Sequence, residues 1–498
     1  MKRREFLRGT LVLGALGGLS CRQAEQPWHW ATLEELKSAF QQGRLTPEQL
    51  LQHFFRRIDS LNPSLGAVLE LSPRASGLAA QKRAYRSPLS GVPVLIKDNL
   101  SVADGLATSA GSLALEGNHI DRDAEAVARL RRAGMIPLGR ANMSEWSNLR
   151  AQKSLSGWSA RGGQCRNPYA LDRSPSGSSS GCAVAVAAGL VPLALGTETM
   201  GSITCPASVC GIVGLKPTRG LIPCQGMVPC VPSFDCPGPM ARTVRDLAFM
   251  LQALVEPAVD YVGALRTGAL RGARLGVARQ EWGFDPKVDE VLDQALELLR
   301  QQGAELVDPV PVPSLQQLGR EVALVFACEM KQALDAYLGA LGPEVAVHSL
   351  EELIRFNLEH RQPEGLDFLD QELLYRADLS GGTDNPHYAR ARQRLKLEVQ
   401  LATTFRSHRL EAILAPTTGP AWPIDRVYGD RFPGGGGGPP ALAGLPHLTL
   451  PAGLIQGLPV GLSLYGPERS EARLLALAAD FERARGPIAR PTFPGSLP

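Results

Sequence analysis

The sequence has no long apolar run and little net charge. No stretch of about 18 apolar residues occurs among its 498 residues, so we expect no membrane-spanning helix. Lys and Arg number 52 and Asp and Glu 49, which leaves a net charge of +3. Nucleic-acid binding usually requires a clustered basic excess, so the composition gives no reason to expect a nucleic-acid partner.

Several motifs for metals and phosphates are also missing. The 9 cysteines form no Cys-x-x-Cys pair and the 8 histidines no His-Glu-x-x-His, which argues against a zinc site. No Gly-x-x-x-x-Gly-Lys-Ser/Thr string occurs, which excludes a phosphate-binding loop of that type. Most cysteines lie among small apolar residues, so we expect free, buried thiols.

Residues 1–21 have the pattern of an export signal. Residues 3–8 (Arg-Arg-Glu-Phe-Leu-Arg) resemble a twin-arginine motif, and a short apolar stretch follows at 11–19. Ser20-Cys21 resembles the end of a lipobox, although Gly18 stands where an aliphatic residue is usual. Cleavage at a small residue and lipid attachment at Cys21 are therefore both open. We expect a periplasmic or cell-envelope protein, with membrane contact only through a lipid on Cys21.

Strand and helix patterns alternate along the rest of the chain. This alternation predicts an α/β fold, a single large domain with a mixed, largely parallel central sheet surrounded by helices. Residues 310–400 are polar and helix-like, which predicts a helical cover over the site, and the glycines at 434–438 predict a flexible connector or lid. The expected strands are 91–97, 135–138, 191–195, 274–278 and 304–307, and the expected helices are 123–133, 182–190 and 285–302.

A Gly/Ser-rich stretch at 174–220 is the most unusual part of the sequence. It is not a linker, because it alternates with a dense apolar run at 183–195. Residues 177–181 satisfy Gly-x-Ser-x-Gly, the nucleophile elbow of α/β-hydrolases. That elbow must follow a buried strand, whereas residues 166–173 are polar and broken by proline, so we set this interpretation aside.

The chain resembles the amidase signature family, and the order and spacing of several motifs carry this resemblance. It extends over about residues 30–485 and is strongest toward the branch of bacterial peptide amidases. It implies the amidase signature fold, with an amidase domain at 28–495, a signature core at about 91–245 and the helical cover at about 310–400. The motifs are Gly-Val-Pro-Val-Leu-Ile-Lys-Asp-Asn at 91–99, the Gly/Ser stretch, Gly-Thr-Glu-Thr-Met-Gly-Ser-Ile at 196–203, Gly-Ile-Val-Gly-Leu-Lys-Pro-Thr at 211–218, and segments 108–112, 142–146, 161–168, 238–243 and 415–417.

The resemblance implies a Ser–cis-Ser–Lys triad. Ser202 would be the nucleophile, Ser178 the bridging serine on a cis peptide bond, and Lys97 the base. A serine hydroxyl needs an adjacent base to act as a nucleophile. A lysine is a base only when neutral, and burial in apolar surroundings favours the neutral form. The apolar residues 92–96 that precede Lys97 supply such surroundings.

The same resemblance assigns the oxyanion hole to backbone N–H groups of the loop that carries Ser202. These are the N–H groups of Thr199, Met200, Gly201 and Ser202. Ser179 is expected to support the triad. Met200 departs from the Gly or Asp usual at its position, so we expect a narrower or more apolar pocket.

The implied activity is an amidase that hydrolyses a small-molecule carboxamide to a carboxylate and ammonia or an amine, through an acyl-enzyme on Ser202. We expect linear amide C–N bonds, not peptide bonds, to be the substrates, and no metal or organic cofactor to be needed. The alternative is the A-type component of a tRNA-dependent glutamine amidotransferase, which the export signal argues against. The sequence does not reveal the oligomeric state.

Overall fold

A computed structural model describes residues 28–81 and 84–497. The export-signal pattern and Cys21 lie outside these residues. The described chain forms an eleven-stranded sheet in the order β1-β3-β2-β6-β8-β7-β12-β13-β11-β9-β10, with a separate pair β4-β5. The strands are β1 Val68–Leu71, β2 Pro93–Lys97, β3 Ile136–Ala141, β4 Trp158–Ser159, β5 Gly163–Gln164, β6 Leu193–Glu198, β7 Val213–Lys216, β8 Cys236–Ala241, β9 Arg274–Val277, β10 Glu305–Val307, β11 Ala412–Pro416, β12 His447–Ile455 and β13 Leu458–Tyr465.

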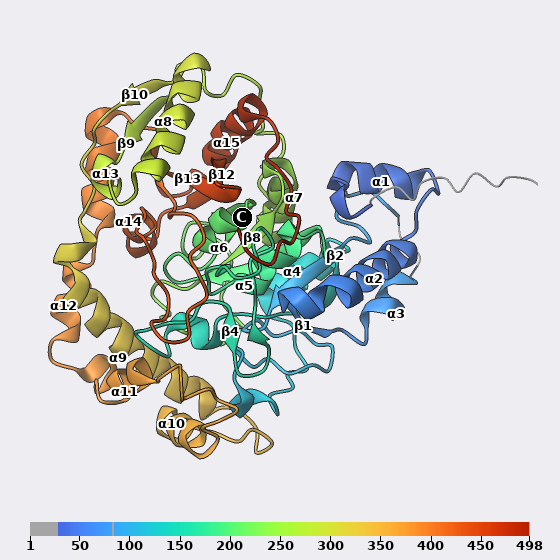
Figure 1. The fold of residues 1–498 in the computed structure, drawn as a ribbon, viewed down its shortest axis with the longest axis vertical. Helices are drawn as coiled ribbons and strands as arrows, with labels where there is room; N and C mark the ends of the chain where they lie inside the picture. The colour runs from blue at the N-terminus through green and yellow to red at the C-terminus, as the bar shows by residue number, and fades with distance from the viewer. Residues whose placement is uncertain (1–27, 82–83, 498) are drawn as a thin grey trace, which may run out of the picture.

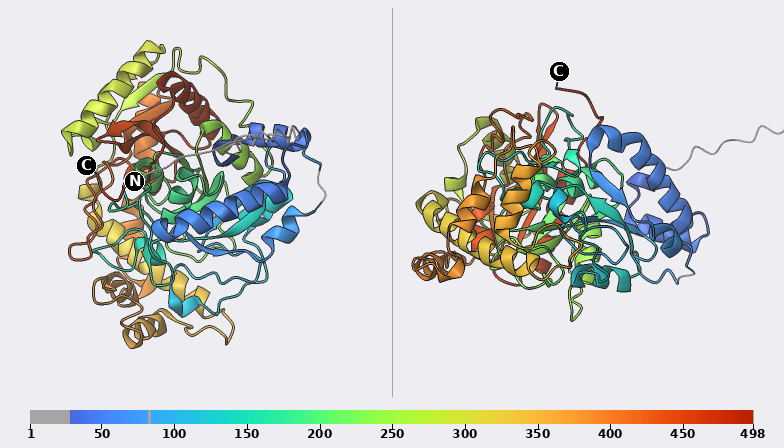
Figure 2. Two further views of the ribbon diagram at one scale, coloured as in Figure 1. Left: turned by 45° about the vertical axis from the view of Figure 1, so that its right-hand side comes forward. Right: turned by 90° about the horizontal axis from the view of Figure 1, so that it is seen from below.

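Helices surround this sheet (Figure 1). Helices α9 to α12 lie together at one side of the molecule, and α1 to α3 lie at the opposite side, as Figure 2 also shows. The α-helices are α1 Leu33–Gln41, α2 Pro47–Leu65, α3 Ala75–Ala79, α4 Glu125–Arg132, α5 Ser180–Ala187, α6 Thr204–Val209, α7 Val244–Leu254, α8 Pro286–Gln301, α9 Gly319–Leu338, α10 Leu350–Glu359, α11 Glu372–Asp378, α12 Tyr388–Arg394, α13 Glu398–His408, α14 Gly438–Leu442 and α15 Glu471–Arg485.

The predicted α/β fold with a mixed central sheet is confirmed. Strand β2 pairs in parallel with both β3 and β6, and β9 pairs in parallel with β10 and β11. The pairs between these two parallel groups, from β6 to β11, are antiparallel. Parallel strands covered by helices on both faces read as continuous apolar runs. This explains why the short run ending at Lys97 forms a fully buried strand.

Helix α5 shows how small residues bring the Gly/Ser-rich stretch into the core. All eight of its residues are buried, and their sequence is Ser-Gly-Cys-Ala-Val-Ala-Val-Ala. Small side chains let a helix backbone approach its neighbours closely. At Gly181 a Cβ atom would lie 2.2 Å from the carbonyl oxygen of Ala67, so only glycine fits there. The tight packing places the residues just before α5 beside β2 and β6.

A buried ion cluster joins the core to the segment after α10. Arg150 donates through Nη1 to Glu145 and, at 3.2 Å, to Oε2 of Glu364. Burial raises the pKa of Glu145. Burial, and then the charge of Glu145, raise the pKa of Glu364 to about 8. One guanidinium thus serves two carboxyl groups, which favours a proton on the pair.

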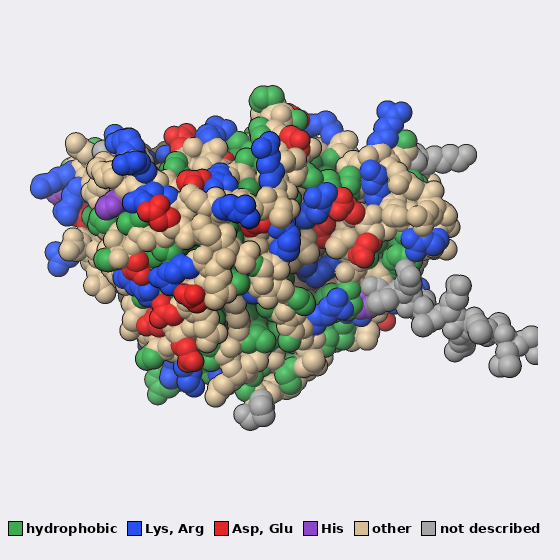
Figure 3. Space-filling view, turned by 90° about the horizontal axis from the view of Figure 1, so that it is seen from above, with side chains coloured by type: hydrophobic (Ala, Val, Ile, Leu, Met, Phe, Trp, Pro, Cys, Tyr) green, Lys and Arg blue, Asp and Glu red, His purple; other side chains and the backbone are tan. Residues whose placement is uncertain are grey.

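Acidic and basic side chains share the surface, and almost all described cysteines lie in the core. On the face in Figure 3, acidic and basic side chains are interspersed. Across residues 28–81 and 84–497, no helix has the length and apolar character required to cross a membrane. The eight cysteines of the described chain are free, and all but Cys224 are buried, as expected for thiols that act as small apolar side chains.

Candidate active site

Lys97 ends strand β2 inside the core. Its side chain is fully buried, and β3 and β6 flank its strand in parallel. Burial lowers the pKa of the Lys97 amine from 10.5 to about 8, because an ammonium ion loses its hydration inside the protein. Lys97 is therefore much closer to neutrality at physiological pH than an exposed lysine.

Three oxygen atoms surround the Lys97 amine. Its Nζ lies 2.7 Å from Oγ of Ser178, 2.9 Å from Oγ1 of Thr197 and 3.2 Å from the Thr197 carbonyl oxygen. A neutral amine has two N–H donors and one lone pair. It can therefore donate to both Thr197 oxygens and accept the Ser178 hydroxyl proton. Asn99 donates to Oγ1 of Thr197 at 3.0 Å and so helps to fix this oxygen.

Ser178 is held just before α5. It is fully buried, and its peptide bond to Gly177 is cis, as the resemblance implied. The Ser178 carbonyl accepts a hydrogen bond from the Ser144 N–H at 3.1 Å. A Cβ on Gly177 would lie 2.1 Å from Oγ of Ser144, so a larger residue would displace this hydroxyl, which accepts from the Gly157 N–H at 2.8 Å. Gly177 thus lets the loop before α5 bring the Ser178 hydroxyl to Lys97.

Ser202 lies in the loop between β6 and α6. Gly201, just before it, has a φ of 83°, which is in the left-handed region where glycine is favoured. The Ser202 carbonyl accepts from the Ser179 N–H at 3.0 Å, and Oγ of Ser179 donates to the Thr197 carbonyl at 2.9 Å. Ser179 thus joins the Ser202 loop to the residue that contacts Lys97. The structure thus brings Lys97 and Ser178 into direct contact and holds the Ser202 loop through Ser179, the neighbour of Ser178, while no hydrogen bond joins the Ser178 and Ser202 hydroxyls in the described chain.

Two carboxylates that flank the loop fix its shape. Oε2 of Glu198 accepts from the N–H groups of Ile203 and Thr204 at 2.7 and 2.9 Å. Oδ1 of Asp235 accepts from the Thr199 hydroxyl at 2.6 Å. We expect such carboxylates to hold the backbone N–H groups in place. Glu198 was not among the predicted site residues, although it is an acidic residue shortly before a short helix of small residues.

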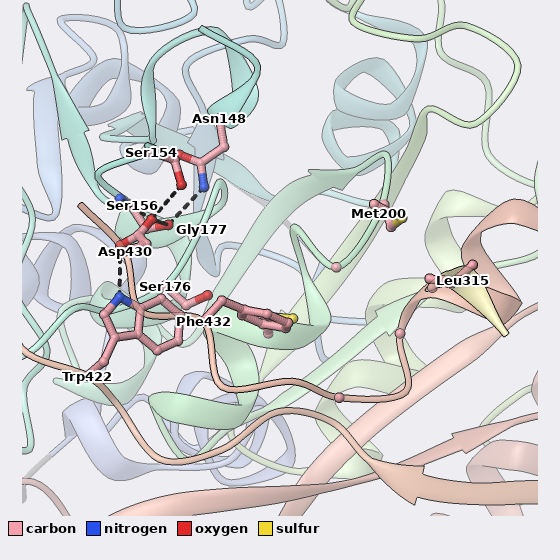
Figure 4. Close-up of a pocket in the computed structure, with 15 residues that line it drawn as sticks. Asn148, Ser154, Ser156, Ser176, Gly177, Met200, Leu315, Trp422, Asp430 and Phe432 are labelled. Atoms are coloured by element: carbon pink, nitrogen blue, oxygen red, sulfur yellow. Dashed lines mark hydrogen bonds between the residues drawn. The ribbon is translucent and has the colours of Figure 1, made fainter. Parts of the chain in front are cut away.

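A cavity of about 260 Å³ opens beside this loop. Gly177 and Gly201, the chain neighbours of Ser178 and Ser202, both line it. Met200 also lines the cavity and is 39% exposed, so its side chain is part of the pocket wall. The other lining residues are Asn148, Ser154, Ser156, Ser176, Cys205, Leu315, Trp422, Asp430, Phe432, Gly435, Gly437 and Gly438, most of them drawn with labels in Figure 4.

The glycine run at 434–438 forms part of the cavity wall, not only a flexible connector. A Cβ on Gly435 would lie 2.2 Å from the Thr417 carbonyl oxygen, and one on Gly436 would lie 2.5 Å from Cβ of Ala415. The run therefore packs flat against the end of β11, and α14 begins at Gly438. Glycine is needed here for close approach, a reason that local sequence does not reveal.

The fold and the motifs have clear counterparts among known proteins. The sequence pattern of the family described as Amidase matches residues 49–475. The chain belongs to the amidase family. One amidase relative is a probable amidase of Arabidopsis thaliana, 36% identical and covering 91% of this chain and 90% of the relative. The A-type component of the glutamyl-tRNA(Gln) amidotransferase of Thermus thermophilus is 35% identical, covering 90% of this chain and 96% of that protein.

Solved amidase structures overlay closely. The peptide amidase PAM in complex with the competitive inhibitor chymostatin is 41% identical, with a TM-score of 0.88, over 94% of this chain and 100% of that chain. The native peptide amidase of Stenotrophomonas maltophilia is 40% identical, with a TM-score of 0.87, over 94% and 99%. These similarities correct one expectation. The expectation that the substrates are linear amide C–N bonds and not peptide bonds is wrong, because these two similar structures are peptide amidases.

Proposed function

We propose that this amidase hydrolyses carboxamides through a triad of Lys97, Ser178 and Ser202. The observation that carries the proposal is the buried Lys97 amine, 2.7 Å from the Ser178 hydroxyl and beside the loop that bears Ser202. A base of lowered pKa next to a hydroxyl is the arrangement that activates a serine nucleophile.

The reaction proceeds in two halves. Neutral Lys97 takes the Ser178 proton while Ser178 takes the Ser202 proton, and Oγ of Ser202 forms a bond to the amide carbonyl carbon. The C–N bond then breaks, and the relayed proton leaves with ammonia or an amine. Water attacks the resulting ester on Ser202 with the same relay, so that the carboxylic acid departs and Ser202 regains its proton.

The loop before α6 stabilises the negative charge that forms on the carbonyl oxygen in this reaction. We assign the oxyanion hole to backbone N–H groups of residues 199–202. Removing one such donor typically costs about 10²–10³ in rate. Side chains anchor both ends of the loop, through Thr199 on Asp235 and through the N–H groups of Ile203 and Thr204 on Glu198. This anchoring supports a hole that is formed before the substrate binds.

The favoured substrates are carboxamides that include the amide at the end of a peptide. The similarity to the peptide amidases supports this class. Glutamine hydrolysis, as the A-type component of an amidotransferase, is less well supported. Glutamine carries a carboxylate, and no Lys, Arg or His is among the described residues that line the cavity.

An ammonia-release assay on the purified full chain tests the proposal. We expect release from primary amides such as N-acetylated amino-acid amides, and loss of release by about 10⁴-fold or more in Ser202→Ala. The matched control is Ser208→Ala. Ser208 is a buried serine of helix α6, which follows the Ser202 loop, and it does not line the cavity. A folded Ser202→Ala that retains full activity would exclude Ser202 as the nucleophile.

We also propose export through the twin-arginine pattern, with a lipid on Cys21 as the anchor. Replacing the two arginines at positions 3 and 4 by lysine should leave the protein in the cytoplasmic fraction. Cys21→Ser should release exported protein from the membrane fraction. Unchanged fractionation of both variants would contradict the proposal.

A further inference from the structure

The cavity has two chemically different sides. Hydroxyl, amide and carboxylate groups of Asn148, Ser154, Ser156 and Asp430 lie together on one side, where hydrogen bonds join them (Figure 4). Met200 and Leu315 lie apart from this group in the same view. A ligand whose carboxamide lies at the Ser202 loop would therefore meet a mixed polar and apolar wall with its remaining part.

Asp430 is the one charged side chain among the described residues that line the cavity, and four donors already occupy it. Its Oδ2 accepts from the Ser154 hydroxyl at 2.8 Å and from the N–H and hydroxyl of Ser156 at 2.8 and 2.7 Å. Its Oδ1 accepts from the indole N–H of Trp422 at 2.8 Å. The carboxylate therefore anchors residues 422–432, here called the cavity loop, and a ligand group that bound it directly would compete with these donors.

Phe432 is placed by this anchor. It follows Asp430 by two residues, and its ring stands edge-on to Trp422, with ring centroids 6.0 Å apart at 85°. The Phe432 side chain is 53% exposed although it lines the cavity. Met200, on the oxyanion loop, is also exposed and lines the same cavity. Covering exposed apolar area is favourable, so both side chains favour an apolar ligand group.

We propose that the cavity selects carboxamides whose acyl part is bulky, neutral and apolar, with Phe432 as the selecting residue and Asp430 as the residue that positions it. This inference rests on the proposed amidase function. An anionic acyl part would lose hydration in the cavity and meet the Asp430 carboxylate, with no cationic side chain in the described wall. A cationic acyl part that paired directly with Asp430 would have to compete with the four donors that hold this carboxylate. A small acyl part would leave Phe432 and Met200 exposed.

The test compares four substrates on the full chain. These are the primary amides of N-acetylated phenylalanine, glycine, aspartic acid (at its α-carboxyl) and lysine, with kcat and KM measured from ammonia release. We expect kcat/KM to be higher for the phenylalanine amide than for the other three by about tenfold or more, the usual effect of an apolar contact.

Variants of the cavity loop locate the selecting residue. Phe432→Ala should lower kcat/KM for the phenylalanine amide by about tenfold, mainly through KM, and change the glycine amide by less than about twofold. Phe432→Leu should restore most of the loss. Asp430→Asn should raise KM for the phenylalanine amide with little change in kcat. The matched control is Val427→Ala, because Val427 belongs to the same loop, is 74% exposed and does not line the cavity.

Two results would overturn the inference. One is equal kcat/KM for all four amides in the unmodified chain. The other is an equal loss for the phenylalanine and glycine amides in Phe432→Ala, which would make Phe432 structural. Failure of the unmodified, folded chain to release ammonia from any amide would overturn the proposed function itself, and is distinguished from both by the absence of activity before any substitution.

Discussion

Activity should follow the ionisation of Lys97. Burial lowers the pKa of this amine from 10.5 to about 8, a change that corresponds to about 3 kcal/mol. At pH 7 about one molecule in ten then carries the neutral base, against about one in three thousand at the ordinary pKa. Burial alone therefore raises the active fraction by about 300-fold at pH 7.

The assay is kcat/KM for a neutral primary amide from pH 5.5 to 9.5. We expect a rise of about tenfold per pH unit at low pH that levels near pH 8. Lys97→Arg should be inactive, because a guanidinium stays protonated in this range. Lys216→Met is the matched control, since Lys216 is equally buried but donates to the Pro217 carbonyl. Its profile should keep the same midpoint.

The same burial makes Lys97 a cost to stability. When folding lowers the pKa of a lysine, the free energy of unfolding decreases as the pH falls from the unfolded pKa to the folded pKa, here from 10.5 to about 8. At pH 7 the full cost is present. Lys97→Met should therefore raise the free energy of unfolding at pH 7 by about 1–2 kcal/mol, after the loss of hydrogen bonds to Thr197 and Ser178. Denaturant unfolding measures this change. If kcat/KM did not change with pH and Lys97→Met were less stable than the unmodified chain, the argument from burial would be refuted.

Two further predictions concern stability away from the triad. Burial and the charge of Glu145 raise the pKa of Glu364 from 4.5 to about 8, so stability should fall as the pH rises from about 4.5 to about 8. Glu364→Gln should flatten this fall in scanning calorimetry, and an unchanged slope would contradict the pairing. Gly436→Ala should destabilise by about 1–3 kcal/mol in urea unfolding because its Cβ overpacks the end of β11. Gly77→Ala, in α3 with no atom within 4 Å of the added Cβ, should instead stabilise by about 0.5–1 kcal/mol, and a similar cost at both glycines would show that packing is not the cause.

The sequence by itself determined the local elements and the fold class. Short apolar runs predicted buried strands such as β2 and β6, because a strand covered on both faces has no polar alternation. The residue types of the candidate triad were also visible, but their meeting was not. Lys97 and Ser178 are 81 positions apart in the sequence, and this separation alone does not show that their side chains are in contact. Only the resemblance of the motifs linked them before the structure was known.

Tertiary structure decided the surroundings on which the chemistry depends. The lowered pKa of Lys97 comes from complete burial between β3 and β6, which no local pattern measures. The glycines at 434–438 are required by contacts with the end of β11, so their sequence is equally compatible with a flexible connector. The cavity wall joins Met200 to Phe432 across more than two hundred residues. Burial and long-range contact arise only when distant segments pack together, and these properties therefore had to be read from the folded chain.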